Sequence, residues 1–397
     1  ASVASITGKK VTVTWLVYAI ILFTFIDLFT QLPVMSTYAA SLGASASIAG
    51  FTVGLYSLTN MFGNAVSGIF TDWYGAGRML KIGLLASSCA LLSYSLILNV
   101  AGLLIVRFVH GFLSGLIVPA AFTYMANLTR REKQGSQSAI TGSFVGIAAI
   151  AGPAYSGIMA SRTSVPFVFA TIAVLGIVLF AISLRVLNAK QGNSVRERRK
   201  GGTLRLNSGL LQAYTGSFFL MFSQGALAYL LPLHVESLGY SSRLSGMLMS
   251  AFGIVAVAIF LLPTNRLFDR VRPIANLSAG LGLMGISQIL LGQSGRMMEL
   301  GLVMVLYGIG FALLFPSINT LLIHATDPDN RGQAYGFFYA LFSCGVVAGS
   351  SGLALLPASV KTQFLVTGAI LMLCVISIVV WTKNSGRTRK EAFETNE

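Results

Sequence analysis

Residues 165–184 read VPFVFATIAVLGIVLFAISL, twenty positions without a charged side chain. A helix of about 20 apolar residues has the length that crosses the hydrocarbon core of a bilayer. The whole chain shares this character, since 55% of its 397 residues are hydrophobic and only 10% are charged, with a mean hydropathy of +0.77. A soluble domain carries about 25% charged residues. The composition therefore predicts a polytopic membrane protein and excludes disordered, collagenous and disulfide-scaffold classes.

Apolar stretches of at least about 18 residues recur along the chain, and each predicts a membrane-spanning helix. Twelve such spans are predicted, at 13–38, 46–70, 79–98, 100–126, 135–160, 165–187, 208–236, 243–264, 272–292, 296–323, 332–355 and 362–382.

The net charge of +15 would suggest a nucleic-acid partner in a soluble protein, so the location of the charge decides its meaning. Of the 27 Lys and Arg residues, 22 fall on one side of the predicted spans. Four lie on the other side (Arg162, Arg243, Arg296 and Lys361), and Arg107 lies inside a span. Cytoplasmic loops of membrane proteins carry such an excess of basic residues. We therefore expect a multi-pass protein of the cell membrane with both termini in the cytoplasm, and no nucleic-acid partner.

The two halves of the chain resemble each other at a constant offset of 196 or 197 residues. The matched pairs are Gly43 with Gly239, Gly50 with Gly246, Asp72 with Asp269, Gly111 with Gly308, Pro119 with Pro316, Gly135 with Gly332 and Gly152 with Gly349. Such a series predicts two six-helix units, at 1–187 and 208–397, joined by a basic linker at 188–207. Transporters built from repeats place their binding site near the bilayer midplane between the units.

Three motifs lie in the first unit. Residues 68–78 read GIFTDWYGAGR between the second and third spans, residues 107–111 read RFVHG in the fourth, and residues 152–157 read GPAYSG in the fifth. Over essentially its whole length, the chain with these motifs resembles the major facilitator superfamily. The resemblance implies an all-α membrane fold of 12 transmembrane helices in two pseudo-symmetric six-helix bundles.

By this resemblance, residues 68–78 form a gating motif on the cytoplasmic side. Asp72 would accept hydrogen bonds from Arg78 and from the start of the eleventh helix near Gly332, because exposed N–H groups at a helix N-terminus favour an anion. The motif departs from the family pattern, since Trp73 replaces a basic residue and the next basic residue follows Gly75 by three positions. The gating residues are Gly68, Asp72, Gly75 and Arg78.

The GPAYSG segment resembles the motif associated with antiporters in the same family. Its residues are Gly152, Pro153 and Gly157, with Gly142 and Gly146 upstream. The segment favours export over import.

Asp27 is the one acidic residue well inside a predicted span, about midway along the first helix. A charged side chain at that depth costs about 2.5–3.5 kcal/mol on insertion scales, so it is rarely kept without a use. Arg107 and His110, three residues apart, share a face of the fourth helix. We expect Asp27, Arg107 and His110 to couple protons, with Arg107 favouring the ionised carboxylate and His110 titrating near neutral pH. The alternatives are a structural partnership between Asp27 and Arg107, and a packing role for His110.

Uncharged polar and aromatic residues at helical spacing indicate a large, weakly charged cavity, although each one could equally be a helix-packing contact. The candidate cavity residues are Gln31, Tyr38, Tyr56, Asn60, Asn64, Gln224, Tyr307, Phe311, Asn319, Tyr335 and Tyr339. Such a lining suits amphipathic organic molecules.

The sequence thus predicts a secondary transporter that exports drugs or metabolites in exchange for protons by alternating access. A proton-coupled nutrient importer or facilitator and a lipid or lysolipid flippase are the alternatives. We expect a monomer that is not an enzyme, whose partners are a small amphipathic substrate, protons and membrane lipids. No cofactor or metal site is predicted, since the sequence contains neither a P-loop nor a cluster of metal ligands.

Overall fold

The computed structural model describes residues 3–31, 34–187, 203–240, 242–262 and 266–394. These residues form helices joined by short connections, with no strand among them. The long helices are α1 (Val3–Gln31), α3 (Ala46–Tyr74), α4 (Ala76–Ser93), α5 (Val100–Ser114), α6 (Ile117–Leu128), α7 (Gln134–Arg162), α8 (Val165–Val186), α9 (Ser208–Ser237), α10 (Ser242–Leu261), α12 (Pro273–Gln293), α13 (Met297–His324), α14 (Arg331–Val347) and α15 (Val360–Glu394). The predicted all-α fold is confirmed.

Ten segments within the described residues are long and apolar enough to cross a membrane. One of them, Val100–Leu128, joins α5 and α6 into a single span with a break after Ser114. The helix α10 contributes the shorter apolar segment Gly246–Leu261. The helix α3, 29 residues long, carries polar residues such as Asn60 and Asn64 that lower its hydropathy.

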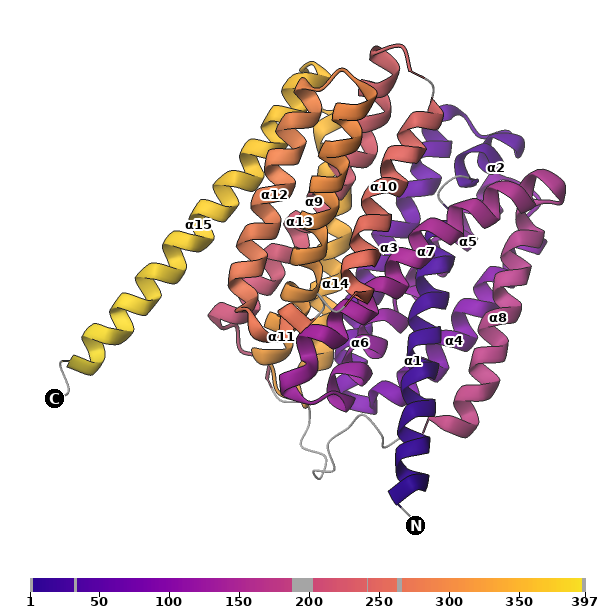
Figure 1. Cartoon of the computed structure of the whole chain (residues 1–397). Coiled ribbons are helices and arrows are strands. Elements are labelled where there is room, and N and C mark those ends of the chain that lie inside the picture. The colour runs from indigo at the N-terminus through magenta and orange to yellow at the C-terminus, as the bar shows by residue number, and fades with distance from the viewer. Residues whose placement is uncertain (1–2, 32–33, 188–202, 241, 263–265, 395–397) are drawn as a thin grey trace.

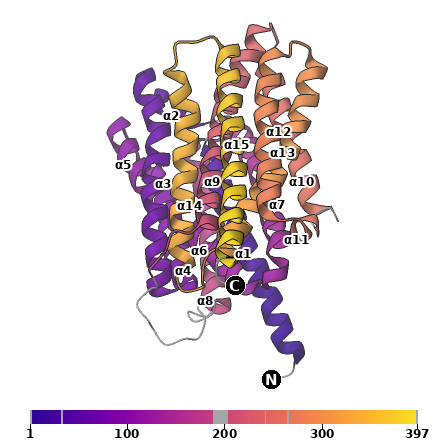
Figure 2. The same cartoon turned by 90° about the vertical axis from the view of Figure 1, so that its left-hand side faces the viewer.

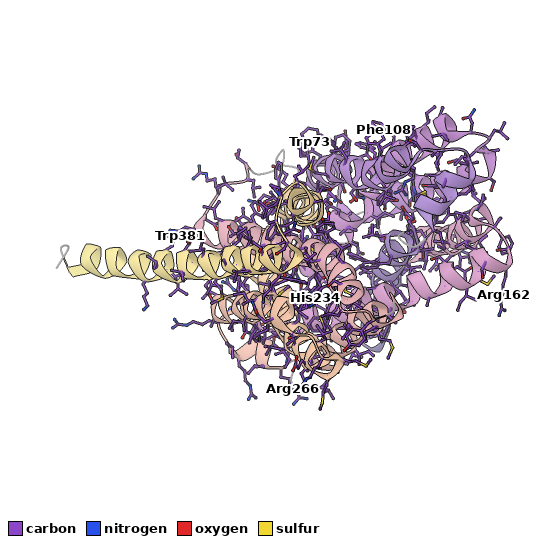
Figure 3. All side chains as sticks on the ribbon, turned by 90° about the horizontal axis from the view of Figure 1, so that it is seen from above. Trp73, Phe108, Arg162, His234, Arg266 and Trp381 are labelled. Carbon is purple, nitrogen blue, oxygen red and sulfur yellow. The ribbon has the colours of Figure 1, made fainter. Side chains whose placement is uncertain are left out.

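Three helix ends differ from the predicted spans. The first helix ends at Gln31 rather than at 38, and a separate helix α2 (Met35–Ser41) follows it. The eleventh span changes from α14 into a π-helical turn at Ala348–Gly352. The last helix, α15, continues to Glu394, and its final turns, beyond Trp381, project away from the bundle (Figures 1 and 3). Hydropathy detects where a chain can cross a bilayer, but not where a helix breaks or how far it continues into water.

The helices form two bundles that stand side by side, with the first half of the chain on the right of Figure 1 and the second half on the left. The start of α1 and the end of α15 lie at the same end of the molecule, below in Figures 1 and 2. This end is called the terminal end below, and the other the distal end. Most of the predicted linker, 188–202, falls outside the described residues.

The sequence repeat has a backbone counterpart. Gly43 and Gly239, which match at an offset of 196, both have a positive φ, +94° and +81°. L-residues with a side chain rarely adopt this conformation, whereas glycine adopts it freely. The two halves therefore turn in the same way after their first long helix.

The two bundles contact each other through α3 with α14 and through α7 with α10 and α13. The closest approach of α3 and α14 is at Gly68, where an added Cβ atom would lie 2.5 Å from the Gly332 carbonyl oxygen and 2.7 Å from the Gly336 Cα atom. Gly54, about four turns toward the distal end of α3, has nothing within 4 Å of the same added atom. Backbone-to-backbone packing therefore closes the terminal half of this crossing.

We expect Gly68→Ala to weaken this closure. An extra methyl group in a well-packed contact costs about 1–3 kcal/mol, and separating α3 from α14 would relieve the strain. The ratio of open to closed molecules at the terminal end should rise about fivefold or more, because 1 kcal/mol is a factor of about five. Distances between spin labels on the two bundles measure this ratio. Gly54→Ala is the matched control on the same helix, and equal distributions for the two variants would contradict the prediction.

Candidate functional site

The Asp27 carboxylate is buried inside the first bundle, with 1% of the residue exposed. Gln31 donates to its Oδ1 from Nε2 (2.9 Å), and Ser114 donates to its Oδ2 from Oγ (3.1 Å). The Nε2 atom of His110 lies 3.0 Å from the same Oδ2. An isolated charge at this depth would be costly, and three hydrogen bonds compensate for much of the lost hydration. Because α1 ends at Gln31, Asp27 lies one turn from the distal end of the helix, not midway along it as predicted.

Both ring nitrogens of His110 are engaged, and the residue is fully buried. Its Nδ1 lies 2.9 Å from the hydroxyl oxygen of Tyr94, from the 3-10 turn that follows α4. The Tyr94 hydroxyl can donate to Nδ1 or accept from it, because a phenol can do either. The same hydroxyl accepts from Nη1 of Arg107 at 3.4 Å.

Arg107, 2% exposed, holds a fixed positive charge beside this pair. Its guanidinium donates to the Gln31 side-chain oxygen, to the backbone oxygen of Thr52 (3.0 Å) and to that of Val53 (3.3 Å). Its central carbon lies 4.8 Å from the ring centroid of Tyr56, a cation–π contact. These bonds tie α5 to α3 and to the end of α1.

Asp27 and Arg107 are linked through Gln31, which donates to the carboxylate and accepts from the guanidinium. The structure therefore does not show the direct partnership of Asp27 with Arg107 that the sequence left open. With Asp27 ionised and His110 neutral, the cluster has no net charge, since Arg107 balances the carboxylate. One added proton, shared between Asp27 and His110, changes the charge to +1. We call Asp27, Gln31, Tyr94, Arg107, His110 and Ser114 the buried polar cluster.

Sequence reasoning missed two members of this cluster. Ser114 follows His110 by four residues, so helical spacing could have placed it on the same face. Tyr94 comes from a different span and carries no local signal, because only packing brings it to His110. Gln31 and Tyr56, predicted to line a substrate cavity, both belong to the surroundings of the buried charges.

The second bundle contains an uncharged counterpart of the buried pair. Ser223 and Tyr307, which match Asp27 and His110 at offsets of 196 and 197, have their hydroxyl oxygens 2.9 Å apart. Gln288 donates to the Ser223 hydroxyl (3.0 Å), and the position that matches Arg107 is Met304. The repeat thus preserves the contact between these two helices while replacing its charges with hydroxyl groups.

The other predicted cavity residues lie in several different places. Asn60 donates to the Gly111 carbonyl, and Asn64 donates to Asn60 and, at 3.4 Å, to the carbonyl of Tyr339, across the two bundles. The half-buried Gln224 has a buried amide nitrogen without a hydrogen-bond partner among the described residues. Tyr38 lies on α2, beyond the end of α1, rather than on the first helix as predicted.

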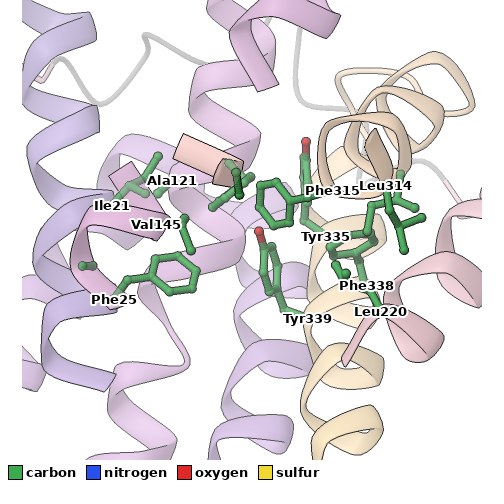
Figure 4. Packing of buried hydrophobic residues seen from close by; sticks show 14 of the residues in the cluster. Ile21, Phe25, Ala121, Val145, Leu220, Leu314, Phe315, Tyr335, Phe338 and Tyr339 are labelled. Carbon is green, nitrogen blue, oxygen red and sulfur yellow. The ribbon is translucent and has the colours of Figure 1, made fainter. Parts of the chain in front are cut away.

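Two linked hydrogen bonds form a layer at the boundary between the bundles, and one of them crosses it. Tyr335 donates from its hydroxyl to the Asn319 side-chain oxygen, and Asn319 donates to the Ser138 hydroxyl at 2.5 Å. One turn further along α14, Tyr339 packs with Phe122 of the first bundle, at a ring distance of 5.0 Å. Phe311 stacks on Phe315, also among these aromatic side chains. Figure 4 shows Phe315, Tyr335 and Tyr339 facing Val145 and Phe25 of the first bundle.

Two carboxylates clasp the bundles together at the terminal end. Asp72 accepts from the backbone N–H groups of Gly332 and Gln333, at 2.7 Å each, at the start of α14. Asp269, its counterpart in the repeat, accepts from the N–H of Ser136 at 2.9 Å, near the start of α7. Each carboxylate thus caps a helix of the other bundle, where the helix dipole favours negative charge.

The predicted bond between Asp72 and Arg78 is absent from the described residues, where Arg78 is exposed and Asp72 takes its partners from α14. Gly75 ends α3 with a φ of +94°, so the chain turns sharply between Asp72 and Arg78. Arg78 then lies on the following helix, α4. Arg78 follows Gly75 by three positions, and this spacing places it on α4, away from Asp72.

The residues of the antiporter motif all lie in α7. Gly152 packs against α1, since an added Cβ atom would lie 3.0 Å from the Phe29 Cβ and 3.1 Å from the Thr30 nitrogen. Gly157 has nothing within 4 Å of such an atom, and the backbone of Pro153 continues the helix. The upstream Gly142 and Gly146 contact Phe260 and Val257 of α10. The motif glycines therefore face two different helices.

A family model described as Major Facilitator Superfamily matches residues 17–212 and 213–396. The chain belongs to this superfamily. Its two matched regions together cover nearly all the residues, and the ten candidate spans agree with a multi-pass membrane transporter.

Several superfamily members named as multidrug proteins are similar to the chain at low identity. The multi-drug resistance efflux pump PmrA of Streptococcus pneumoniae serotype 4 is 25% identical over 335 residues, 80% of this chain and 82% of PmrA. The multidrug resistance protein MdtG of Escherichia coli O9:H4 is 25% identical over 377 residues, 90% of each chain.

Solved superfamily structures share the fold. The human organic anion transporter MFSD10 has a TM-score of 0.79 at 16% identity, over 93% of this chain and 99% of that one. The proton:xylose symporter XylE has a TM-score of 0.73 at 16% identity, over 93% and 95%. At these identities the likeness concerns the fold alone.

Proposed function

We propose that this superfamily member exports amphipathic small molecules across the cell membrane in exchange for protons. The observation that carries the proposal is the contact between Asp27 and His110, two titratable groups 3.0 Å apart and fully buried. The pair lies beside the fixed charge of Arg107 and has other hydrogen-bond partners in Gln31, Ser114 and Tyr94. The names of PmrA and MdtG support the substrate class.

Exchange requires that the proton and the substrate bind the transporter in alternation. A ligand shifts the equilibrium between two conformations only when it binds one of them more tightly than the other. In the neutral cluster Arg107 and Asp27 balance each other, and a loaded proton adds an uncompensated charge to a site of low polarity. We infer that this added charge favours the conformation in which the cluster reaches water, where the charge is better solvated. The terminal end would be the cytoplasmic one, as the basic residues on that side predict.

The direct test uses purified protein in liposomes and the dye ethidium, a permanently charged amphipathic probe that a pH gradient does not trap by itself. Liposomes with an acidic lumen should accumulate ethidium through the protein, since protons leaving the lumen would drive the dye inward. A symporter would require the acid outside, and uptake in that direction only would contradict the proposal. Protein-free liposomes give the background.

His110→Gln should have a milder effect than the loss of Asp27. Glutamine keeps hydrogen-bonding capacity but cannot titrate, whereas histidine titrates between about pH 5 and 8. We expect proton-driven ethidium uptake to fall several-fold and its dependence on pH between about 5.5 and 7.5 to flatten. Uptake measured across this range checks the result, with Tyr155→Phe, which removes a hydroxyl bonded to Thr171 of α8, as a control. A variant profile that retains the wild-type shape would assign His110 a packing role.

A further inference from the structure

Tyr339 carries a buried hydroxyl that has no hydrogen-bond partner among the described residues. The side chain is 3% exposed, so bulk water does not reach it. Leaving a buried donor unpaired is costly, which is why most such groups in folded proteins have a partner. Among the other buried tyrosines, the hydroxyl groups of Tyr94, Tyr307 and Tyr335 are bonded, and that of Tyr124 in the first bundle is unpaired like that of Tyr339. The unpaired state of Tyr339 therefore requires an explanation.

The surroundings of Tyr339 are aromatic and come from both bundles. Its ring lies 5.0 Å from that of Phe122, 5.0 Å from Phe338 and 5.3 Å from Phe342, and it is stacked on Tyr335 at 6.4 Å. Figure 4 shows its hydroxyl pointing toward Phe315 and Val145, on the boundary between the bundles. Rings offer flat, apolar contact area for another planar molecule, with an offset or edge-on geometry.

The position of Tyr339 on α14 also suits a binding role. It lies one turn from Gly336, where α14 meets the backbone of α3, and beside the hydrogen-bonded layer formed by Tyr335, Asn319 and Ser138. The hydroxyl therefore lies on the distal side of the bond between Asn319 and Ser138, at the boundary between the bundles, where Met61 of α3 and Cys344 of α14 also meet further along. A molecule bound at this boundary, on the distal side of the Asn319 bond, would contact the Tyr339 hydroxyl.

We propose that Tyr339 donates a hydrogen bond to the transported substrate, and that the preferred substrates are planar aromatic molecules with a hydrogen-bond acceptor on the ring edge. The aromatic cluster would hold the ring system, and the hydroxyl would select the acceptor. This proposal rests on the proposed function, because it identifies a substrate class for the same transporter. It adds a specificity residue in the second bundle, separate from the proton pair in the first.

Three tricyclic compounds of similar shape test this selection. Acridine carries a ring nitrogen that accepts, carbazole an N–H group that donates, and anthracene neither. At pH 8, where acridine is neutral, the wild-type protein should bind acridine more tightly than the other two. A hydrogen bond to a buried partner corresponds to a factor of about 5–30 in affinity. Each compound displaces the fluorescent dye ethidium from the purified protein in detergent, and the displacement curves measure all three affinities.

Tyr339→Phe removes the hydroxyl and keeps the ring, so it should abolish the preference for acridine while leaving anthracene affinity unchanged. The variant should fold with equal or higher thermal stability, since the hydroxyl it loses is unpaired. Tyr155→Phe, which removes a hydroxyl bonded to Thr171 between α7 and α8, should keep the preference. A preference retained in Tyr339→Phe, a preference for carbazole, or no acridine binding to the wild type would each overturn the proposal.

These outcomes are independent of the test of proton exchange. Acridine selection is measured at equilibrium without a gradient, whereas proton-driven uptake of ethidium depends on Asp27 and His110. If Tyr339→Phe keeps the preference while wild-type liposomes accumulate ethidium, the specificity inference fails and the exporter stands. If the preference disappears as expected but no uptake occurs in either gradient direction, the binding residue stands and the exporter fails.

Discussion

Asp27→Asn is expected to abolish proton-driven transport. Asparagine resembles the protonated carboxyl group in shape. Its oxygen can still accept from Gln31, and its amide nitrogen, in the place of Oδ2, can donate to the Ser114 hydroxyl, so the bundle should fold. It cannot release or load a proton, and a transporter whose states no longer differ in proton affinity has no coupling between proton and substrate. Gradient-driven ethidium uptake should fall at least about a hundredfold, to the level of protein-free liposomes, since the coupling itself is lost.

Downhill exchange of ethidium provides the second readout for this variant. The conformational change does not need a charge on residue 27, so exchange without a gradient should remain within about threefold of the wild type. Loss of both activities would point to misfolding, which size-exclusion and thermal-unfolding profiles detect. Ser223→Ala is the matched control, because Ser223 occupies the same place in the second bundle and bonds to Tyr307. Coupled uptake by Asp27→Asn at near the wild-type rate would make Asp27 structural.

The second large effect is expected at Asp72 and Asp269, the two carboxylates that join the bundles at the terminal end and are called the clasps below. Asp72→Asn and Asp269→Asn each remove a carboxylate that caps a helix of the opposite bundle. Burial raises the pKa of Asp72 to about 7, so its variant is compared with the wild type at pH 8, where the carboxylate is charged. Hydrogen bonds to charged groups contribute about 1.5–3 kcal/mol, so each variant should raise the ratio of open to closed molecules at the terminal end about tenfold or more. The two sites are far apart in sequence and use different helices, so the double variant should shift the ratio about a hundredfold.

Spin labels at the exposed positions Lys133 and Pro328, one on each bundle, report this opening as a longer distance. Ethidium transport should slow, because the closed state becomes rare, while its affinity changes less than about tenfold, since the clasps do not touch the proposed substrate region. Glu132→Gln removes an exposed acid on the same face and serves as the control. An unchanged distance distribution in the double variant would show that other contacts, such as the backbone approach at Gly68 and the bond from Arg331 to Asn127, close the terminal end without the carboxylates.

The superfamily structures similar to this chain show how far sequence can diverge while the fold remains, with 16% identity at a TM-score of 0.79. The reason is that the fold depends on spans of sufficient hydropathy and on close contacts between helices. Gly111 illustrates such a contact, since an added Cβ atom would lie 2.5 Å from the Tyr56 carbonyl oxygen on α3. Its repeat counterpart, Gly308, makes the equivalent approach to Phe252, at 2.7 Å.

By itself the sequence determined the class of the protein, its helical spans and the repeat, because a bilayer requires long apolar helices and a duplication leaves matched residues at one offset. It also singled out Asp27, since a carboxylate inside a span is rare. Only the tertiary structure decided its partners. Gln31 stands between Asp27 and Arg107, and Tyr94 reaches His110 from another span. The resemblance predicted the contact of Asp72 with the start of α14 near Gly332, and the structure contains it without the predicted bond to Arg78. These contacts join helices far apart in the chain, and their geometry follows from how the helices pack, which no local pattern of residues records.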